Sequence, residues 1–274
     1  MQLPQLSSLI QAFLPTATIT DYKRLKSGLI NQTFHLHLEA EGGSKQCILQ
    51  QINRTVFGQP VQIMDNIKKT SHHLAQSQYP LQLLLPYAGQ DGRYYHLDES
   101  GEYWRLFNYL ENTTVLEQVE HAQQATAAAY AFGQFLSALW DFAPQQLHST
   151  IPNFHLPSLR YKKLQQLIDQ NPFQRRVHAR TAIEFLHKQS ILLQRFQPQD
   201  LPLRVTHNDT KISNVLFDHK KERGVAVIDL DTLMPGQIPF DFGVSSKRCP
   251  VSGTVASHTT LLSGVSNLSP FGIS

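Results

Sequence analysis

Apolar and polar side chains alternate along the first fifty residues with the two-residue period of β-strands. In residues 28–39, every second side chain lies on one mainly apolar face, with polar residues mostly opposite. Residues 18–26 and 45–52 are similarly rich in β-branched and apolar side chains. Residues 41–44 (Glu-Gly-Gly-Ser) separate the last two segments as a hairpin turn. The pattern predicts three neighbouring strands at the N-terminal end of the chain.

The first helix is expected after these strands. Pro60 begins a segment in which Ile63, Met64, Ile67 and Leu74 fall on one side at helical spacing. Proline is favoured at the first position of a helix, because its missing N–H has no helical partner there in any case. This segment is therefore predicted to be an amphipathic helix that packs on the sheet.

Further short strands are expected before the period changes. Apolar stretches at residues 81–86, 94–97 and 103–109 flank a turn at residues 89–92 (Gly-Gln-Asp-Gly). Beyond about residue 112, the spacing of apolar residues changes from two to about 3.6. The sequence thus changes from a mainly strand-forming to a mainly helix-forming pattern.

The second part of the chain reads as helices around one buried strand. Helical spacing covers residues 127–140, 158–169 and 177–196, and residues 225–228 form a short apolar strand. A β-rich front with one helix therefore precedes a helical back half. This order predicts an α+β fold.

The change of period also predicts the domain organisation. Residues 1–110 are expected to form a lobe with an antiparallel sheet and one helix, and residues 111–243 a mainly helical lobe. Residues 244–274 contain no acidic residue, are rich in serine and lack a sustained helical period. Such a composition favours irregular structure, so this last segment is expected to be an irregular tail.

The composition narrows the class of protein. Apolar residues make up 41% of the chain and charged residues 16%, which is typical of a soluble globular protein. The net charge is +3 and the basic residues are scattered, which argues against nucleic acid or an anionic membrane as a partner. No apolar run approaches the ~18 residues of a membrane span, and the N-terminus lacks signal-peptide features. Cys47 and Cys249 alone cannot form a disulfide framework or a zinc site, so a cytoplasmic location is expected.

The segment His207-Asn208-Asp209-Thr210-Lys211-Ile212-Ser213-Asn214 carries the most informative chemistry. In kinase-type phosphoryl transfer, an H-x-D-x-x-x-x-N loop supplies an Asp that accepts the proton of the attacking hydroxyl. The Asn of that loop and a later Asp hold Mg²⁺ on the nucleotide phosphates. His207, Asp209 and Asn214 fit the loop, and Asp229 fits the metal position at the end of an apolar strand. A polar surface loop is the alternative, but it does not explain the order and spacing of the whole set.

Roles are also expected for three other residues near this set. Lys211, two residues after the candidate base, is placed to reach the transferring phosphate. Asp231 points to the same side as Asp229 in an extended chain, so it is expected to be a second metal ligand or to support the first. Asp241-Phe242-Gly243 spells the protein-kinase metal motif, but it does not directly follow a buried strand after the loop. Asp241 is therefore expected to be structural, as a cap of the helix that should follow.

With these residues, the chain resembles the aminoglycoside phosphotransferase and choline kinase superfamily, which has a two-lobed, protein-kinase-like fold. Within it, the chain is most similar to the N-acetylhexosamine 1-kinases. The likeness covers residues from about 15 to 243. The stretches that carry it are residues 28–34, 48–53, 56–57, 103–105, 151–155, 207–218, 227–232 and 234–236.

The resemblance implies an ATP- and Mg²⁺-dependent kinase that acts on a hydroxyl group of a small molecule. In the N-acetylhexosamine branch, this is the anomeric hydroxyl of an amino sugar. The resemblance also implies that the loop from Gly28 through Asn31 to Thr33 covers the phosphates. The hinge between the lobes, which should hydrogen-bond adenine, is expected near residues 107–110, which include Phe107 and Tyr109.

Two departures from the superfamily pattern matter. Many members carry Lys or Arg on the third strand to hold the phosphates, whereas this chain has Gln50, as the sugar-kinase branch does. A neutral amide supplies no charge, so Lys211 or Mg²⁺ is expected to offset the phosphates. No helical Glu partner is evident, and Asp65 is the nearest acid on that helix. In addition, the likeness ends at Gly243, which leads to the hypothesis of a shifted reading frame with the C-terminal helices missing.

Two alternatives remain beside an amino-sugar kinase. One is a choline- or aminoglycoside-directed kinase, although no obvious cluster of carboxylates or aromatic residues would bind a cationic substrate. The other is an inert, truncated nucleotide-binding protein. Gln50 and the tail favour the inert alternative, whereas the intact set of Asp209, Asn214 and Asp229 opposes it.

Overall fold

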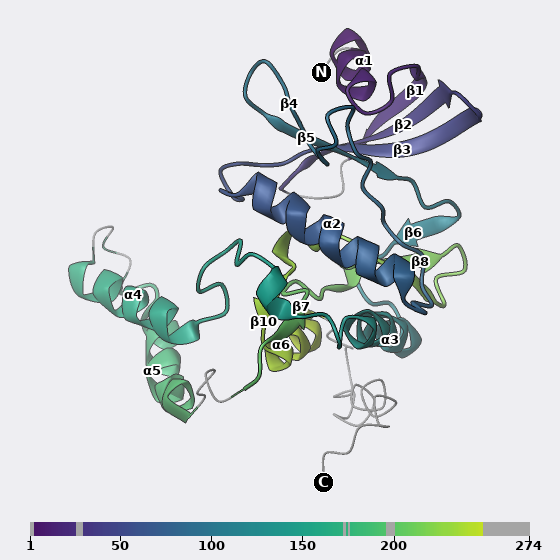
Figure 1. Cartoon of the computed structure of the whole chain (residues 1–274). Coiled ribbons are helices and arrows are strands. Elements are labelled where there is room, and N and C mark those ends of the chain that lie inside the picture. The colour runs from purple at the N-terminus through teal and green to yellow at the C-terminus, as the bar shows by residue number, and fades with distance from the viewer. Residues whose placement is uncertain (1–2, 26–29, 172–173, 175, 196–200, 249–274) are drawn as a thin grey trace. The chain divides into compact units, whose positions relative to one another are not determined.

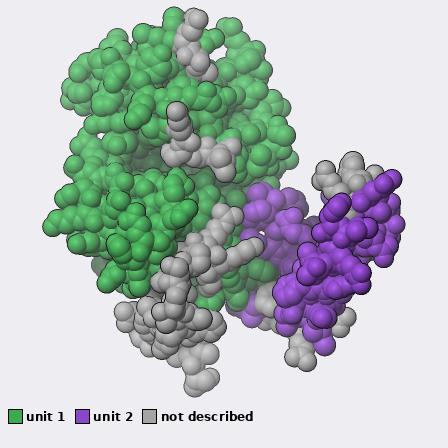
Figure 2. Space-filling view, turned by 180° about the vertical axis from the view of Figure 1, so that it is seen from behind, with its two compact units in different colours: residues 1–150, 204–274 green, residues 151–203 purple. Residues whose placement is uncertain are grey.

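The computed structural model describes residues 3–25, 30–171, 174, 176–195 and 201–248 (Figure 1). The chain divides into two compact units. One comprises Met1–Thr150 and Arg204–Ser274, and the other comprises Ile151–Leu203 (Figure 2). Every residue predicted to act in catalysis, nucleotide binding or metal binding belongs to the first unit. Within the described ranges, no helix is both long and apolar enough to cross a membrane.

Five antiparallel strands form the sheet of the N-terminal part. Across the sheet they are β1 (Thr18–Leu25), β2 (Gln32–Ala40), β3 (Gly43–Gln51), β5 (Tyr103–Asn108) and β4 (His96–Leu97). β2 and β3 form a hairpin that is paired along its whole length. The three strands predicted at the start of the chain are confirmed, although the second begins four residues later than expected.

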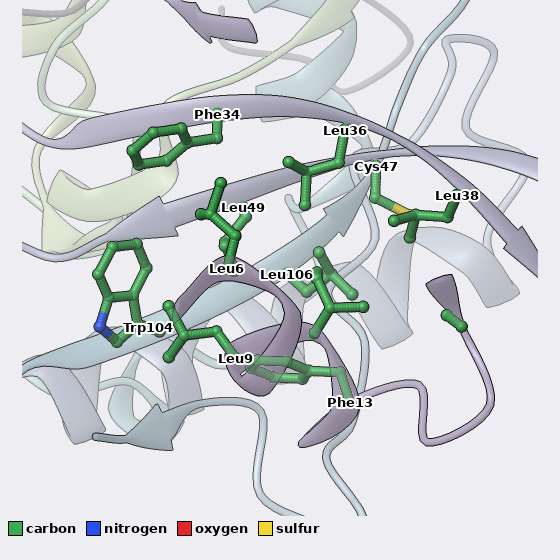
Figure 3. Packing of buried hydrophobic residues seen from close by; sticks show 12 residues of the cluster. Leu6, Leu9, Phe13, Phe34, Leu36, Leu38, Cys47, Leu49, Trp104 and Leu106 are labelled. Carbon is green, nitrogen blue, oxygen red and sulfur yellow. The ribbon is translucent and has the colours of Figure 1, made fainter. Parts of the chain in front are cut away.

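A short helix, α1 (Leu3–Gln11), covers one face of this sheet (Figure 3). Leu6, Leu9 and Ile10 lie on one side of α1 and are buried. The apolar side of β2, β3 and β5 packs against them and supplies Phe34, Leu36, Leu38, Cys47, Leu49, Trp104 and Leu106. The sequence pattern did not predict α1, because its apolar stripe is only about one turn long. A helix this short depends on packing for its stability.

The other face of the sheet carries polar side chains. Thr33, Gln50 and Arg105 are direct cross-strand partners on β2, β3 and β5. Because side chains alternate along a strand, these three lie opposite the apolar core. They therefore point away from α1.

The predicted amphipathic helix is α2 (Pro60–Gln76), and it buries the four apolar residues expected on its inner side. Its Asn66 is fully buried. The Asn66 Nδ2 group donates to the carbonyl oxygens of His148 (2.8 Å) and Leu233 (2.9 Å), and Oδ1 accepts from the His148 N–H (2.8 Å). Asn66 thus joins α2 to two loops of the second half of the chain.

The second half of the first unit contains a small sheet backed by a helix. Its strands lie in the order β6 (Thr113–Val115), β8 (Val215–Asp218) and β9 (Gly224–Val227). The helix α3 (Ala122–Ala138) packs on β9. α3 begins five residues earlier than the apolar spacing predicted, because alanines form its first turns.

A second pair of short strands flanks the predicted catalytic loop. β7 (Arg204–Thr206) leads into the loop and pairs with β10 (Met234–Gly236). α6 (Ile238–Arg248) follows β10. Among its described residues, the 3-10 turns of this unit are η1 (Pro144–Gln146), η3 (Ile212–Asn214) and η4 (Leu230–Thr232).

Two expectations about elements were wrong. Residues 81–86 form no strand in the structure and make only one isolated bridge, between Pro86 and Phe107. Pro80 and Pro86 lack N–H donors, which limits ladder pairing there. The helix α6 also continues through residues 244–248, which were expected to be irregular. The remainder of the expected tail, residues 249–274, lies outside the described residues.

The second unit contains α4 (Pro157–Gln170) and α5 (Arg180–Arg195), close to their predicted bounds. Asn171 ends α4 in the left-handed conformation (φ 41°), as is common after a helix. The Tyr161 hydroxyl contacts the Nδ1 atom of His187 at 2.7 Å, which joins the two helices.

Candidate active site

The loop between β7 and η3 is held by a carboxylate from α6. The buried Asp241 accepts the backbone N–H groups of His207 (2.8 Å) and Asn208 (2.6 Å), one on each oxygen. Asn208 has a left-handed backbone (φ 66°), which asparagine tolerates better than most residues. Asp241 is therefore structural, as predicted. However, it fixes the loop at residues 207–208 and does not cap its own helix.

His207 supports the loop from within the core. Its side chain is fully buried, with its ring edge-on to Phe132 and Phe135. Nε2–H donates to the Ile228 carbonyl (2.9 Å), and Nδ1 accepts the Asp209 N–H (3.3 Å), a pattern that requires the neutral ring. Burial lowers the pKa of His207. The ring thus faces the core and supports the backbone of the loop, and a catalytic role for His207 stays a prediction.

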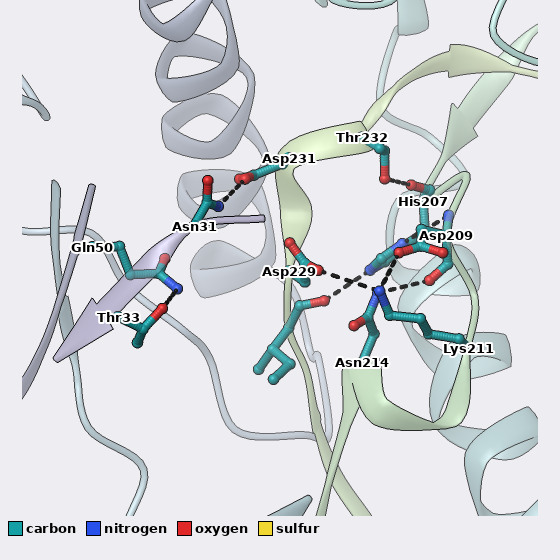
Figure 4. A network of polar contacts seen from close by, with 11 residues as sticks. Asn31, Thr33, Gln50, His207, Asp209, Lys211, Asn214, Asp229, Asp231 and Thr232 are labelled. Carbon is teal, nitrogen blue, oxygen red and sulfur yellow. Dashed lines mark hydrogen bonds and ion pairs between the residues drawn. The ribbon is translucent and has the colours of Figure 1, made fainter. Parts of the chain in front are cut away.

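Asp209 lies at the centre of the candidate site (Figure 4). Its Oδ2 atom accepts from the Lys211 Nζ group (2.7 Å) and from the Asn214 Nδ2 group (3.1 Å). Asn214 Nδ2 also donates to the Asp209 carbonyl (2.8 Å). Both side-chain donors therefore reach the same carboxylate oxygen, Oδ2.

Asp229 joins this group from the end of β9. It adopts a left-handed backbone (φ 60°), and its carboxylate lies 3.7 Å from the Lys211 Nζ group. Desolvation and the nearby Asp231 raise the pKa of Asp229 to about 6, against the opposing effect of Lys211 and Arg105. Because 39% of its side chain is still open to solvent, water moderates this shift. A carboxylate in such surroundings favours a bound cation.

The residues present fit a magnesium ion. The described part of the chain contains no cluster of three His, Cys, Asp or Glu side chains that could enclose a metal. Mg²⁺ does not need such a cluster, because it is commonly held by one or two protein oxygens together with phosphate and water. Asp229 and the amide oxygen of Asn214 are oxygen donors of this kind.

Asp231, the third expected metal ligand, has other partners. Its Oδ1 atom accepts from Arg105 Nη1 (2.5 Å) and its Oδ2 atom from Asn31 Nδ2 (2.7 Å). Its side chain is 1% exposed and that of Arg105 is 2% exposed. Figure 4 shows Asp231 directed toward Asn31, away from the group around Asp209. In the structure Asp231 links the metal-site loop to the sheet, and its expected part in metal binding, as ligand or as support for Asp229, stays a prediction.

The predicted nucleotide-binding residues are only partly brought together. Gly28 lies outside the described residues. Thr33 and Gln50 are in contact, since Gln50 Nε2 donates to Thr33 Oγ1 (3.0 Å). Phe107 is buried, and the Tyr109 ring stacks on His35 with centroids 4.0 Å apart.

Sequence reasoning missed Arg105 and gave Asp65 no partners. Asp65 contacts Lys69 (2.6 Å) and His148 (2.8 Å), so it is not the partner of Gln50. Arg105 lies in the stretch 103–105, which was noted only as part of the likeness to the kinase superfamily. The signal that could have found it is a charged residue inside the apolar run Trp-Arg-Leu-Phe, because such a residue needs a buried partner.

The fold and the site together define a phosphotransferase with a protein-kinase-like architecture. The family model described as the phosphotransferase enzyme family (APH) matches residues 21–256. This chain therefore belongs to that family. The match continues past Gly243, where the resemblance was expected to end.

Solved structures of antibiotic kinases share the fold. An aminoglycoside 2'-phosphotransferase-IIIa mutant in complex with GDP has a TM-score of 0.65 and 13% identity, over 97% of this chain and 86% of its own. An amicoumacin kinase in complex with AMP-PNP and Ca²⁺ has a TM-score of 0.63 and 12% identity, over 96% and 76%. A spectinomycin phosphotransferase in complex with ADP and spectinomycin has a TM-score of 0.63 and 14% identity, over 100% and 82%. These likenesses confirm the α+β, kinase-like fold.

Proposed function

We propose that this protein is an ATP- and Mg²⁺-dependent kinase that phosphorylates a hydroxyl group of a small molecule. The observation that carries the proposal is the arrangement around Asp209, whose carboxylate is oriented by Lys211 and Asn214 beside Asp229. This is the set of groups that phosphoryl transfer requires: a base, a cation near the phosphates and oxygen ligands for a metal.

The chain's own residues would divide the work as follows. Asp209 accepts the proton as the acceptor oxygen attacks the γ-phosphorus and the bond to ADP breaks. Lys211 orients the Asp209 carboxylate and adds positive charge next to the transferred group. Asn214 and Asp229 would hold Mg²⁺, which neutralises phosphate charge when it is bound. The segment from Gly28 to Thr33, of which residues 30–33 are described, would cover the phosphates.

For the acceptor, we propose an N-acetylated hexosamine, phosphorylated at its anomeric hydroxyl. The motifs shared with that branch support this choice, including Gln50 on the third strand. An antibiotic or aminoglycoside acceptor is the second candidate, because the similar solved structures contain spectinomycin and kanamycin.

An acceptor screen with a matched variant tests the proposal. Release of ADP from ATP would be measured with N-acetylglucosamine and N-acetylgalactosamine, and in parallel with kanamycin, spectinomycin and choline. Asp209→Asn keeps the shape of the side chain but removes the base, so kcat should fall roughly 10²–10⁴-fold. Nucleotide binding should be retained in this variant. Equal turnover by Asp209→Asn and the wild type would reject the assignment of the base.

A further inference from the structure

A buried ion pair connects the metal-binding loop to the sheet. Asp231 lies on η4, two residues after Asp229, and binds a different partner with each carboxylate oxygen. Oδ1 pairs with the Arg105 guanidinium from β5, and Oδ2 pairs with the Asn31 amide, which lies just before β2. We call these three residues the Asp231 clamp. In sequence, Asp231 is 126 residues from Arg105 and 200 residues from Asn31.

The Arg105 end of the clamp is fixed on several sides. Arg105 Nε donates to Gln50 Oε1 (3.1 Å), and the guanidinium lies 5.1 Å from the centroid of the Phe107 ring. Gln50 in turn donates to Thr33 Oγ1 (3.0 Å). An arginine can make these contacts at the same time because its donors form a rigid planar fork, which a lysine lacks.

The Asn31 end of the clamp holds the chain where it enters β2. Asn31 Oδ1 accepts the Asn53 N–H (3.0 Å), while Nδ2 donates to Asp231 (2.7 Å). Asn53 Nδ2 also donates to the Ile30 carbonyl (3.1 Å). Residues 30 and 31 are therefore anchored by side chains before the ladder of β2 and β3 begins.

We infer that Arg105 is a positioning residue that acts through Asp231 and Asn31. The clamp holds residues 30 and 31 at a fixed position relative to Asp229. The phosphates and the metal ion would then be bound at the correct distance from each other. The inference rests on the proposed kinase function. The inference also gives a reason for the neutral Gln50 at the third-strand position, because Gln50 accepts a hydrogen bond from Arg105 and helps to hold it. The Arg105 charge is balanced by Asp231, so this cation orders the site and does not bind phosphate directly.

Paired substitutions at positions 31 and 231 test the clamp. Asn31→Asp keeps the acceptor for the Asn53 N–H but places a second carboxylate against Asp231. Binding of AMP-PNP with Mg²⁺, measured by calorimetry, should weaken at least about tenfold, because like charges in contact oppose each other strongly. KM for ATP should rise by a similar factor, and KM for the acceptor should change little. Combining Asn31→Asp with Asp231→Asn restores a donor and an acceptor across the contact. The combination should bring nucleotide affinity back to within about threefold of the wild type, by the logic of double-mutant cycles.

Controls separate the possible failures. Asn112→Asp makes the same chemical change at an exposed position and should leave nucleotide affinity unchanged. The unfolding midpoint, measured without nucleotide, separates a loss of folding from a loss of binding. If the wild type binds no AMP-PNP with Mg²⁺, the proposed function itself fails. If the wild type binds and Asn31→Asp binds equally well, only the clamp is overturned. A combined variant that binds as weakly as Asn31→Asp would also overturn it.

Discussion

At the scale of single residues, the carboxylate of Asp241 determines the shape of the proposed catalytic loop. Both of its oxygens accept backbone N–H groups, and its side chain is buried. Asp241→Asn would place an NH₂ donor against one of those N–H groups, which would lose its acceptor in a buried place. We expect a loss of roughly 1–3 kcal/mol in unfolding free energy, measured by urea denaturation.

An exposed aspartate provides the control for this prediction. The side chain of Asp141 is 82% exposed, and its carboxylate lies 3.1 Å from the His73 ring at the surface. Asp141→Asn should therefore change stability by less than about 0.5 kcal/mol. If Asp241→Asn were as stable as Asp141→Asn, the carboxylate would not be what fixes the loop.

The sequence predicted which residues gather at the site better than it predicted their contacts. Asp209, Asn214 and Asp229 do lie together, because a short loop and an adjacent strand bring them there. The contacts of His207 and Asp231 were not predicted, because they involve partners that are remote in sequence. The Arg105 that pairs with Asp231 is 126 residues away, and no local pattern encodes such a contact.

At the scale of elements, the β7 and β10 pair depends on a glycine. A Cβ atom at Gly236 would lie 2.1 Å from Thr206 Oγ1, which itself donates to the Met234 carbonyl. Gly236→Ala should therefore force the two strands apart next to the catalytic loop. We expect it to lower the unfolding free energy by roughly 1–3 kcal/mol and to reduce kcat as well.

Two variants check this steric explanation. A Cβ atom at Gly58 would have no atom of the described residues within 4 Å, so Gly58→Ala should have little effect on stability. Adding Thr206→Ala to Gly236→Ala removes the oxygen that causes the clash, and part of the lost stability should return. Equal stability of Gly236→Ala and Gly58→Ala would show that the strands adapt to the methyl group.

Elements with a long, regular period were predictable, and short ones were not. α2, α4 and the β2–β3 hairpin follow directly from their apolar spacing. β6 and β8 have three and four residues, and each is defined by pairing with a distant segment. Their stability comes from the sheet that they join, so the local sequence carries little sign of them.

At the scale of the whole molecule, the order of periods predicted an α+β fold, and the resemblance carried by the motifs predicted that it is kinase-like. The similar solved structures confirm that architecture. The separation of Ile151–Leu203 as its own compact unit was not predicted. α4 and α5 have the same helical period as α3, and period alone does not show which helices share a core.

Metal binding should stabilise the whole protein in a way that depends on pH. The pKa of Asp229 is raised to about 6, so the folded protein without metal binds more protons between pH 4 and 6 than the unfolded chain does. The contribution of this group to stability therefore falls as pH rises through that window. A divalent ion binds the deprotonated carboxylate. Above about pH 6 the bound cation therefore offsets the stability that is lost when Asp229 deprotonates. The increase in unfolding temperature caused by Mg²⁺ or Mn²⁺ should be small at pH 5, should grow through pH 6 and should level off above pH 7. Measuring it without nucleotide avoids the titration of the phosphates, and Asp229→Asn should abolish both the increase and its pH dependence. An increase that is equal at pH 5 and pH 8 would mean that Asp229 is not the ligand whose proton the metal displaces.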